Sequence, residues 1–312
     1  MFIQDWWQTT FPKGRQTLKI TDANGLPLSI AYGEKGTGKP LIFVHGVGSW
    51  SYGWRHNIEF LSQYFRVICF DAKGHGFSEK PSYPDNPGHQ AVELARIIQA
   101  LCQEPAVVVA ESLGALITLA TVQAHPELFA RLVVINVPIF PNQLPNWGMR
   151  LLSEIPLDLI RIVDNLRLAS LFSPLVRQIF TIERSQVVVD ATAITEADVH
   201  WLTYPFLEFP NAITKYAEDL QHAAEEIRRL EQKLPNLISN IQDNLRAIAC
   251  PTLILWGDQD QWFPATDGEK LNACLSDSRL QILPNCGHDA AGTCPQEVNS
   301  AILEFLRDTN FI

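Results

Sequence analysis

Runs of apolar residues alternate with amphipathic stretches along the first third of the chain. The segments "PLIFVHG", "FRVICFD", "AVVVA" and "RLVVINV" are almost wholly apolar and rich in Val and Ile, which predicts buried strands. "AVELARIIQAL" and "LGALITLATVQAH" lie among them and have the apolar spacing of helices. Upstream, "TLKI" and "LSIAY" flank the turn-rich "TDANGLP", which predicts a hairpin. Strands that alternate with helices predict an α/β fold whose mostly parallel central sheet is covered by helices on both faces.

The alternation stops between residues 138 and 244, where the patterns are mostly helical. One apolar stripe recurs at steps of three or four from Leu220 to Leu245, and Pro235 should break or kink its helix. We expect this stripe to pack against the rest of the protein, because it spans too few heptads for a coiled coil. Strand and helix patterns then resume at "PTLILWG". The sequence therefore predicts a core domain formed by residues 1–137 and 245–312, with residues 138–244 inserted as a helical cap.

Composition and charge restrict the possible partners. The 312 residues are 46% hydrophobic and 19% charged, as expected of a globular protein. There are 24 Lys and Arg against 34 Asp and Glu, a net charge of −10 with no basic run, so nucleic acid and anionic membranes are not expected partners. The chain has no apolar window long enough for a membrane span, and its start lacks the pattern of a signal peptide.

The six cysteines are dispersed and form no CxxC motif. We expect free thiols in a protein of the reducing cytoplasm, while a pair between Cys286 and Cys294 stays open. The oligomeric state is not determined by any pattern in the sequence.

Reactive side chains follow several of the predicted strands. These strand ends carry His45-Gly46, Glu111-Ser112, Asp258 and Asp260, and His288-Asp289. Because functional groups of a parallel sheet gather at the carboxyl ends of its strands, we expect these residues to lie near one another. Serine attacks a carbonyl only when a base takes its proton, and the imidazole that does so needs an acid to hold its tautomer. Ser112, Asp260 and His288 can fill these roles, and they occur in the chain order typical of a nucleophile-elbow triad.

Five motifs occur in the order and spacing of a known family: "FVHGVGSWSYGWR", "FDAKGHGFSEKP", "VVVAESLGA", "LILWGDQDQWFP" and "LPNCGHDA". With them, the chain from about residue 17 to 310 resembles the α/β-hydrolase fold superfamily. The similar branch is the cap-bearing one, which holds esterases, carbon–carbon bond hydrolases, epoxide hydrolases and haloalkane dehalogenases. An aspartate at the elbow marks the dehalogenases and epoxide hydrolases of this branch, whereas this chain has Ser112. The resemblance therefore implies acyl chemistry at a serine.

The resemblance also implies roles for individual residues. Asp260, three residues beyond Gly257, is the expected acid, which leaves Asp258 as a turn or capping residue. His288 is the expected base. The backbone N–H groups of Val47 and Leu113 are expected to form the oxyanion hole.

Position 110 departs from the usual elbow motif GxSxG. Small residues are needed two before and two after the serine, because strand and helix approach closely around its strained backbone. Gly114 meets this need, and Ala110 adds only a methyl group. We expect a working elbow.

The sequence gives the least information about the wall of the substrate pocket. Trp50, Trp54, Trp147, Trp201 and Phe206 are candidates for an apolar wall, with ordinary core or surface positions as the alternative for each. Arg150, Arg161 and Arg184 could each hold a carboxylate or phosphate of a substrate. Zinc-ligand motifs, a phosphate loop before a helix, and GxGxxG after a strand are missing, so we expect no metal and no cofactor.

These patterns predict a serine hydrolase that cleaves an ester, or a related carbonyl bond, of a small and largely hydrophobic substrate through an acyl-enzyme. A carbon–carbon bond hydrolase of meta-cleavage type would use the same residues. A ligand receptor that keeps the triad but turns over slowly, and a cofactor-free lyase or acyltransferase, are further alternatives, because fold resemblance alone does not choose among them.

Overall fold

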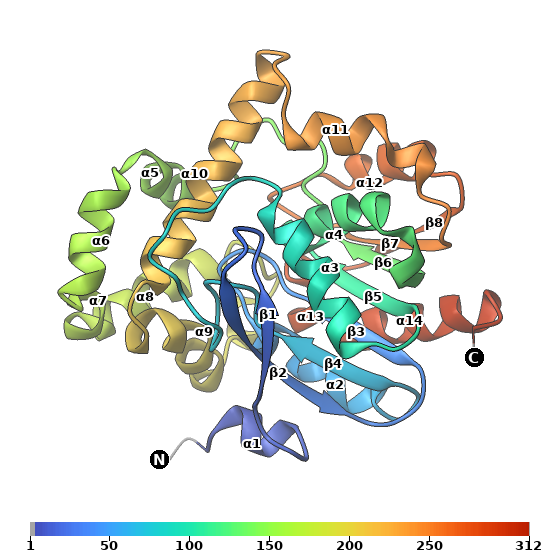
Figure 1. The fold of residues 1–312 in the computed structure, drawn as a ribbon, viewed down its shortest axis with the longest axis horizontal. Coiled ribbons are helices and arrows are strands. Elements are labelled where there is room, and N and C mark those ends of the chain that lie inside the picture. Colours follow the sequence, from blue (N-terminus) through green and yellow to red (C-terminus); the bar gives the residue numbers. More distant parts are fainter. Residues whose placement is uncertain (1–3, 312) are drawn as a thin grey trace.

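An eight-stranded sheet lies at the centre of the computed structural model, which describes residues 4–311 (Figure 1). The strands are β1 (Gln16–Thr21), β2 (Pro27–Lys35), β3 (Pro40–Val44), β4 (Arg66–Phe70), β5 (Ala106–Glu111), β6 (Phe129–Ile135), β7 (Thr252–Gly257) and β8 (Ser278–Leu283). Their order across the sheet is β1-β2-β4-β3-β5-β6-β7-β8. Strand β2 pairs antiparallel with β1 on one side and with β4 on the other. All pairs from β4 across the sheet to β8 are parallel. The predicted α/β architecture is confirmed.

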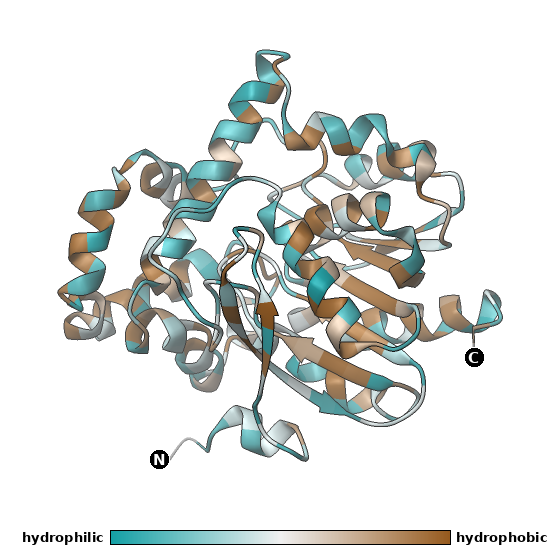
Figure 2. Cartoon of the chain, viewed as in Figure 1, coloured by the Kyte–Doolittle hydropathy of each residue, from teal (hydrophilic) through white to brown (hydrophobic). Residues whose placement is uncertain are grey.

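Helices cover both faces of the sheet, because alternate residues of each central strand point into two separate apolar cores. Leu41 and Phe43 belong to one core, and Ile42 and Val44 belong to the other. The first core is completed by α2 (Arg55–Leu61) and α14 (Pro295–Asp308), and the second by α3 (His89–Leu101), α4 (Leu113–Ala124) and α12 (Ala265–Cys274). Figure 2 shows the central strands as largely hydrophobic, whereas the helices carry a hydrophobic and a hydrophilic side.

The long segment between β6 and β7 is helical, as its sequence pattern predicts. It contains α5 (Trp147–Glu154), α6 (Leu157–Asn165), α7 (Leu168–Leu171), α8 (Ser173–Arg184), α9 (Glu196–Glu208), α10 (Ala212–Glu231) and α11 (Leu237–Asp243). The stripe from Leu220 to Leu245 is split between α10 and α11, with Pro235 in the turn that separates them. Leu220 and Ile241 are buried against the protein, as expected. That residues 138–244 form a cap separate from the core remains a prediction.

Outside residues 138–244, three short helices have no counterpart in the sequence patterns. They are α1 (Trp6–Thr10), which buries Trp6 and Trp7 in the first core, α2, and α13 (Ala290–Thr293). All six cysteines carry free thiols, including the buried Cys286 and Cys294. Within residues 4–311, no helix is both long and apolar enough to cross a bilayer.

Candidate active site

Ser112 lies on a sharp turn between the central strand β5 and helix α4. Its backbone has φ 54° and ψ −128°, a strained conformation for a residue with a side chain. A hydrogen bond of 2.9 Å from its N–H to the carbonyl of Ile135 on β6 holds the turn. Helix α4 passes so close to β3 that a Cβ at Gly114 would lie 2.3 Å from the carbonyl oxygen of His45. The glycine at 114 is therefore required by space, whereas Ala110 is accommodated as a fully buried residue.

Ser112, His288 and Asp260 form a continuous hydrogen-bonded chain. The Oγ of Ser112 is 2.9 Å from Nε2 of His288, and Nδ1 of His288 is 2.8 Å from Oδ2 of Asp260. A carboxylate only accepts hydrogen bonds, so Nδ1 of His288 carries the proton and Nε2 is free to accept one from Ser112. The other carboxylate oxygen, Oδ1, accepts the N–H groups of Trp262 and Phe263 at 2.8 and 3.1 Å. This bracing orients the carboxylate toward the imidazole.

Asp258, the other candidate acid, does not contact His288. Its Oδ1 accepts the N–H of Cys286 at 3.1 Å and so ties the loop after β7 to the loop after β8. The two aspartates therefore have separate positions. Asp260 contacts the imidazole of His288, and Asp258 lies at the base of the loop that carries His288.

The turn after β3 lies directly against Ser112. A Cβ built on Gly46 would lie 3.0 Å from the Cβ of Ser112, so Gly46 packs directly against this side chain. In the part of the chain that the structure describes, the N–H groups of Val47 and Leu113 donate to no acceptor. Both residues line the cavity beside Ser112. Two unused backbone donors next to a serine can stabilise an oxyanion.

His45 braces this turn. Its Nδ1 lies 2.9 Å from the carbonyl oxygen of Gly46, and its Nε2 accepts the N–H of Ala72 at 3.0 Å. Complete burial lowers the pKa of His45, which favours the neutral ring that this pair of contacts requires. His45 therefore serves the shape of the turn.

Glu111 is a partly buried residue immediately before Ser112, and no sequence pattern predicted a role for it. Burial raises its pKa to about 7, and its Oε1 accepts the N–H of Ala291 at 3.1 Å. The guanidinium of Arg184 attracts it electrostatically and is itself paired with Asp289. The one sequence signal for this cluster is the acidic residue directly before Ser112.

An apolar cavity opens beside Ser112. Its aliphatic and aromatic wall consists of Leu113, Leu116, Ile117, Pro138, Pro141, Leu144, Met149, Leu220, Ala223, Ile227, Leu237, Ile238, Trp262 and Phe263. Most of these residues come from α4 and from the inserted helices. Leu220, Ala223 and Ile227 belong to the apolar stripe of α10, which the sequence analysis interpreted only as packing.

Part of the cavity lining is polar and acidic. It includes Asp85, Asp219, Glu226 and His222, and among the described residues that line the cavity none is Lys or Arg. Burial raises the pKa of Asp219 to about 8, so this carboxyl group is mostly protonated at neutral pH. Gln90 donates to its Oδ1 at 2.8 Å. Burial also lowers the pKa of His222.

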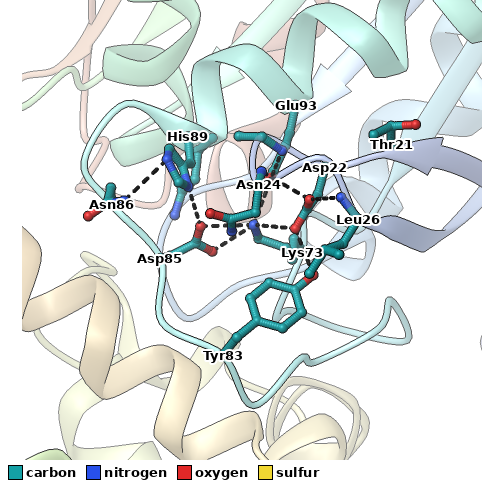
Figure 3. A network of polar contacts seen from close by, with 12 residues as sticks. Thr21, Asp22, Asn24, Leu26, Lys73, Tyr83, Asp85, Asn86, His89 and Glu93 are labelled. Carbon is teal, nitrogen blue, oxygen red and sulfur yellow. Dashed lines mark hydrogen bonds and ion pairs between the residues drawn. The ribbon is translucent and has the colours of Figure 1, made fainter.

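A buried ion network holds this polar lining in place (Figure 3). The Nζ of Lys73 lies 2.8 Å from Oδ2 of Asp85 and also pairs with Glu93 on α3. Asp22, in the turn between β1 and β2, accepts the hydroxyl of Tyr83 at 2.6 Å. The network connects the hairpin turn, the loop before α3 and α3 itself.

The same loop is bound to the inserted helices. Glu218 on α10 accepts the N–H of Asp85 at 3.0 Å, and Lys215 donates to the carbonyl of Tyr83 at 2.9 Å. Lys215 and Glu218 also pair with each other at 2.7 Å. These contacts fix α10 against the core and thereby define one wall of the cavity.

The five aromatic residues expected in the pocket wall do not line this cavity. Trp50, Trp54 and Trp201 are buried in the core on one face of the sheet, where the indole N–H of Trp50 donates to the carbonyl of Trp201 at 3.0 Å. Trp147 is 60% exposed on α5. Phe206 is half-buried and packs edge-to-face on Tyr216. The alternative of ordinary core or surface positions therefore fits these residues, because packing across the fold, which residue type does not encode, decides which aromatic side chains reach a cavity.

The three arginines considered as substrate clamps also lie outside the cavity lining. Arg150 donates to the carbonyl of Leu144 at 2.8 Å, and Arg161 pairs with Asp158 at 2.8 Å. Arg184 pairs with Asp289, as described above. Among residues 4–311, His, Cys, Asp and Glu side chains form no group of three or more that could hold a metal ion.

The chain is similar to known hydrolases in both sequence and structure. The family described as alpha/beta hydrolase fold matches residues 39–293. The 2-hydroxy-6-oxo-6-phenylhexa-2,4-dienoate hydrolase of Comamonas testosteroni is 26% identical over 304 residues, which cover 93% of this chain and 95% of that protein. Epoxide hydrolase 4 of Mus musculus is 26% identical over 294 residues, covering 89% of this chain and 76% of that protein. A thermophilic esterase from Thermogutta terrifontis superposes with a TM-score of 0.70 at 22% identity, covering 94% of this chain and 98% of the esterase.

Proposed function

This chain belongs to the alpha/beta hydrolase fold family, and we propose that it is a serine hydrolase of small, uncharged and largely apolar esters. The observation that carries the proposal is the chain of hydrogen bonds from Ser112 through His288 to Asp260, at 2.9 and 2.8 Å, beside an apolar cavity. A serine aligned on an oriented imidazole is the arrangement that acyl transfer needs.

The mechanism follows from the proton positions. Nε2 of His288 takes the hydroxyl proton as Ser112 Oγ attacks the ester carbonyl, and the resulting oxyanion is held by the N–H groups of Val47 and Leu113. His288 then gives the proton to the leaving alcohol, which leaves Ser112 acylated. Water, deprotonated by the same imidazole, attacks the acyl-enzyme and releases the acid. Asp260 stabilises the imidazolium in both steps.

The cavity lining favours a neutral substrate. Aliphatic side chains from α4 and α10 would contact the acyl or alcohol group, and the acidic groups of the lining are Asp85, Glu226 and the mostly protonated Asp219. A substrate carboxylate would face these acids without a cationic partner, because the described residues of the lining include no Lys or Arg. Neutral esters avoid this repulsion.

A carbon–carbon bond hydrolase is the second candidate. The dienoate hydrolase of Comamonas testosteroni, at 26% identity, supports it, and the same three residues could carry the reaction. Its named substrate is a carboxylate, however, and the acidic lining of this cavity disfavours a carboxylate. We therefore place the ester first.

Labelling and substitution of Ser112 test the proposal. We expect a fluorophosphonate to modify Ser112 and the wild-type protein to hydrolyse p-nitrophenyl butyrate. Ser112→Ala should lower kcat by at least about 10³-fold, because the nucleophile is lost. Mass spectrometry of the labelled peptide and a spectrophotometric assay provide the measurements.

A surface serine provides the matched control. Ser185 is exposed and its hydroxyl donates to the carbonyl of Ile182 at 2.7 Å, within its own helix end, so Ser185→Ala should retain wild-type turnover. Ester hydrolysis that survives Ser112→Ala, or a label on another residue, would contradict the mechanism. A higher kcat/KM for the dienoate than for neutral esters would favour the carbon–carbon hydrolase.

A further inference from the structure

The outer side of the inserted helices holds most of the exposed large apolar side chains of the molecule. Of seventeen such residues in the described chain, eleven lie between residues 147 and 182, on or next to α5, α6, α7 and α8. We call these eleven residues the outer apolar face. The most exposed are Trp147, Leu166 and Leu171, with exposed fractions of 60, 63 and 71%. Isolated exposed apolar residues are ordinary, but this many gathered on consecutive helices mark an interaction surface.

This face is not needed to hold the fold together. In α6, Ile160 and Asp164 face inward, and Oδ2 of Asp164 accepts the N–H of Thr214 on α10 at 2.9 Å, while Leu159 and Ile162 are exposed. In α5, Met149 faces the cavity and Leu151 faces outward. Helices α5 and α6 therefore each have a second apolar side after their inner side is packed. Figure 2 shows hydrophobic residues along the outside of α6 and α7.

The charge of the segment differs from that of the whole chain. Residues 147–182 contain four Arg and three Asp or Glu, whereas the full chain has 24 basic against 34 acidic residues. The exposed Asp158 is neutralised by Arg161 at 2.8 Å. A nearly neutral apolar face on an acidic protein suits an uncharged surface, because the net charge of −10 repels anionic partners and a second copy alike.

The arrangement of the helices also favours a lipid surface over a second copy. In Figure 1, α5, α6 and α7 follow an arc along the left margin of the molecule. Two convex margins would meet along a narrow line, whereas lipid headgroups can part around inserted side chains. Amphipathic helices bind lipid by burying their apolar side to the depth of the headgroups.

We infer that the outer apolar face docks the protein onto the surface of zwitterionic or uncharged lipid. Helix α5 and the residues just before it connect this face with the active site, because Leu144 and Met149 line the cavity while Trp147 and Leu151 face outward. If the proposed function holds, an apolar ester would pass from the lipid into the cavity along α5. The docking itself does not depend on that function.

Binding of the full-length protein to phosphatidylcholine vesicles tests the inference. We expect the wild-type protein to co-sediment with these vesicles, and less so with phosphatidylglycerol vesicles at low salt, since its net charge is −10. A variant with Leu166→Ser, Leu171→Ser and Ile182→Ser should lose about tenfold or more of its partition coefficient. All three side chains are more than half exposed, so the fold should be retained.

A matched variant tests specificity. Leu26→Ser, Val92→Ser and Leu234→Ser replace exposed apolar residues outside the face and should leave vesicle binding within about twofold of wild type. Both variants should keep wild-type turnover of a water-soluble ester. Vesicle binding can be measured even if the protein cleaves no ester, so failure of the proposed function and failure of the docking are distinguishable.

Three results would overturn the inference: no binding of the wild type, equal losses in both variants, or a wild-type dimer that the face variant converts to monomer in analytical ultracentrifugation. The last result would assign the face to a second copy of the chain.

Discussion

At the scale of single residues, the elbow at Ser112 depends on the sizes of its two neighbours. Gly114 has no room for a methyl group, because His45 O would lie 2.3 Å from it. Ala110 is fully buried in β5, where it pairs with Val44 on one side and Val134 on the other. The two small positions that frame the serine are therefore under different constraints.

Gly114→Ala and Ala110→Gly should separate these constraints. Gly114→Ala forces the first turn of α4 away from β3, and we expect a loss of about 1–3 kcal/mol in the free energy of unfolding together with most of the ester turnover. Ala110→Gly should cost only about 0.5–1 kcal/mol and keep turnover, because it adds backbone freedom without a clash. Urea denaturation and an ester assay measure both effects. Equal behaviour of the two variants would contradict this assignment.

At the scale of elements, the hairpin turn, the loop before α3 and α3 itself are joined through buried charges (Figure 3), and Glu218 ties α10 to this loop by accepting the N–H of Asp85. The side chain of Lys73 is 2% exposed and lies among the carboxylates of Asp22, Asp85 and Glu93. Loss of this one cation would leave several acids buried near one another. Because Asp85 and α10 both border the cavity, the network couples stability to the shape of the site.

Lys73→Met should therefore destabilise the protein by about 3–5 kcal/mol, the cost typical of removing one partner of a buried ion pair. Lys13 pairs with Glu34 at 3.2 Å, but its side chain is 69% exposed, so Lys13→Met should cost less than about 1 kcal/mol. Chemical denaturation of both variants measures the difference. A loss below about 1 kcal/mol for Lys73→Met would show that the network contributes little.

At the scale of the whole molecule, Glu111 lies where three parts of the structure meet. It ends the central strand β5, accepts the N–H of Ala291 in α13, and is attracted by Arg184 from the inserted α8. Its buried carboxyl group has a pKa of about 7, compared with an ordinary value of 4.5. The protein therefore binds this proton more tightly when folded than when unfolded.

This proton gives the stability of the protein a defined pH dependence. Below pH 4.5 the carboxyl group is protonated in both states, and its ionisation in the unfolded state lowers the free energy of unfolding as the pH rises toward 7. The full decrease is roughly 3 kcal/mol. Glu111→Gln should remove this contribution, so the stability of wild type relative to the variant should fall over that range. Thermal or urea unfolding at a series of pH values measures the difference, and a constant difference would disprove the shift.

The sequence by itself determined the order of strands and helices and the three residues proposed for catalysis. Both depend on local information. Apolar periodicity follows from the geometry of each element, and Ser112, Asp260 and His288 each lie within a short, unbroken sequence motif. The break at Pro235 was predictable for the same reason, since proline acts on its own helix.

Only the tertiary structure decided the wall of the cavity, the environment of Glu111 and the outer apolar face. Trp50 and Trp201 are distant in the sequence and pack together in a core, whereas Leu220 and Trp262 reach the cavity, and residue type does not distinguish these outcomes. An amphipathic pattern predicts a helix but not which neighbours it meets. Burial, and with it the pKa of Glu111 and the exposure of α5–α8, depends on contacts between segments far apart in the chain.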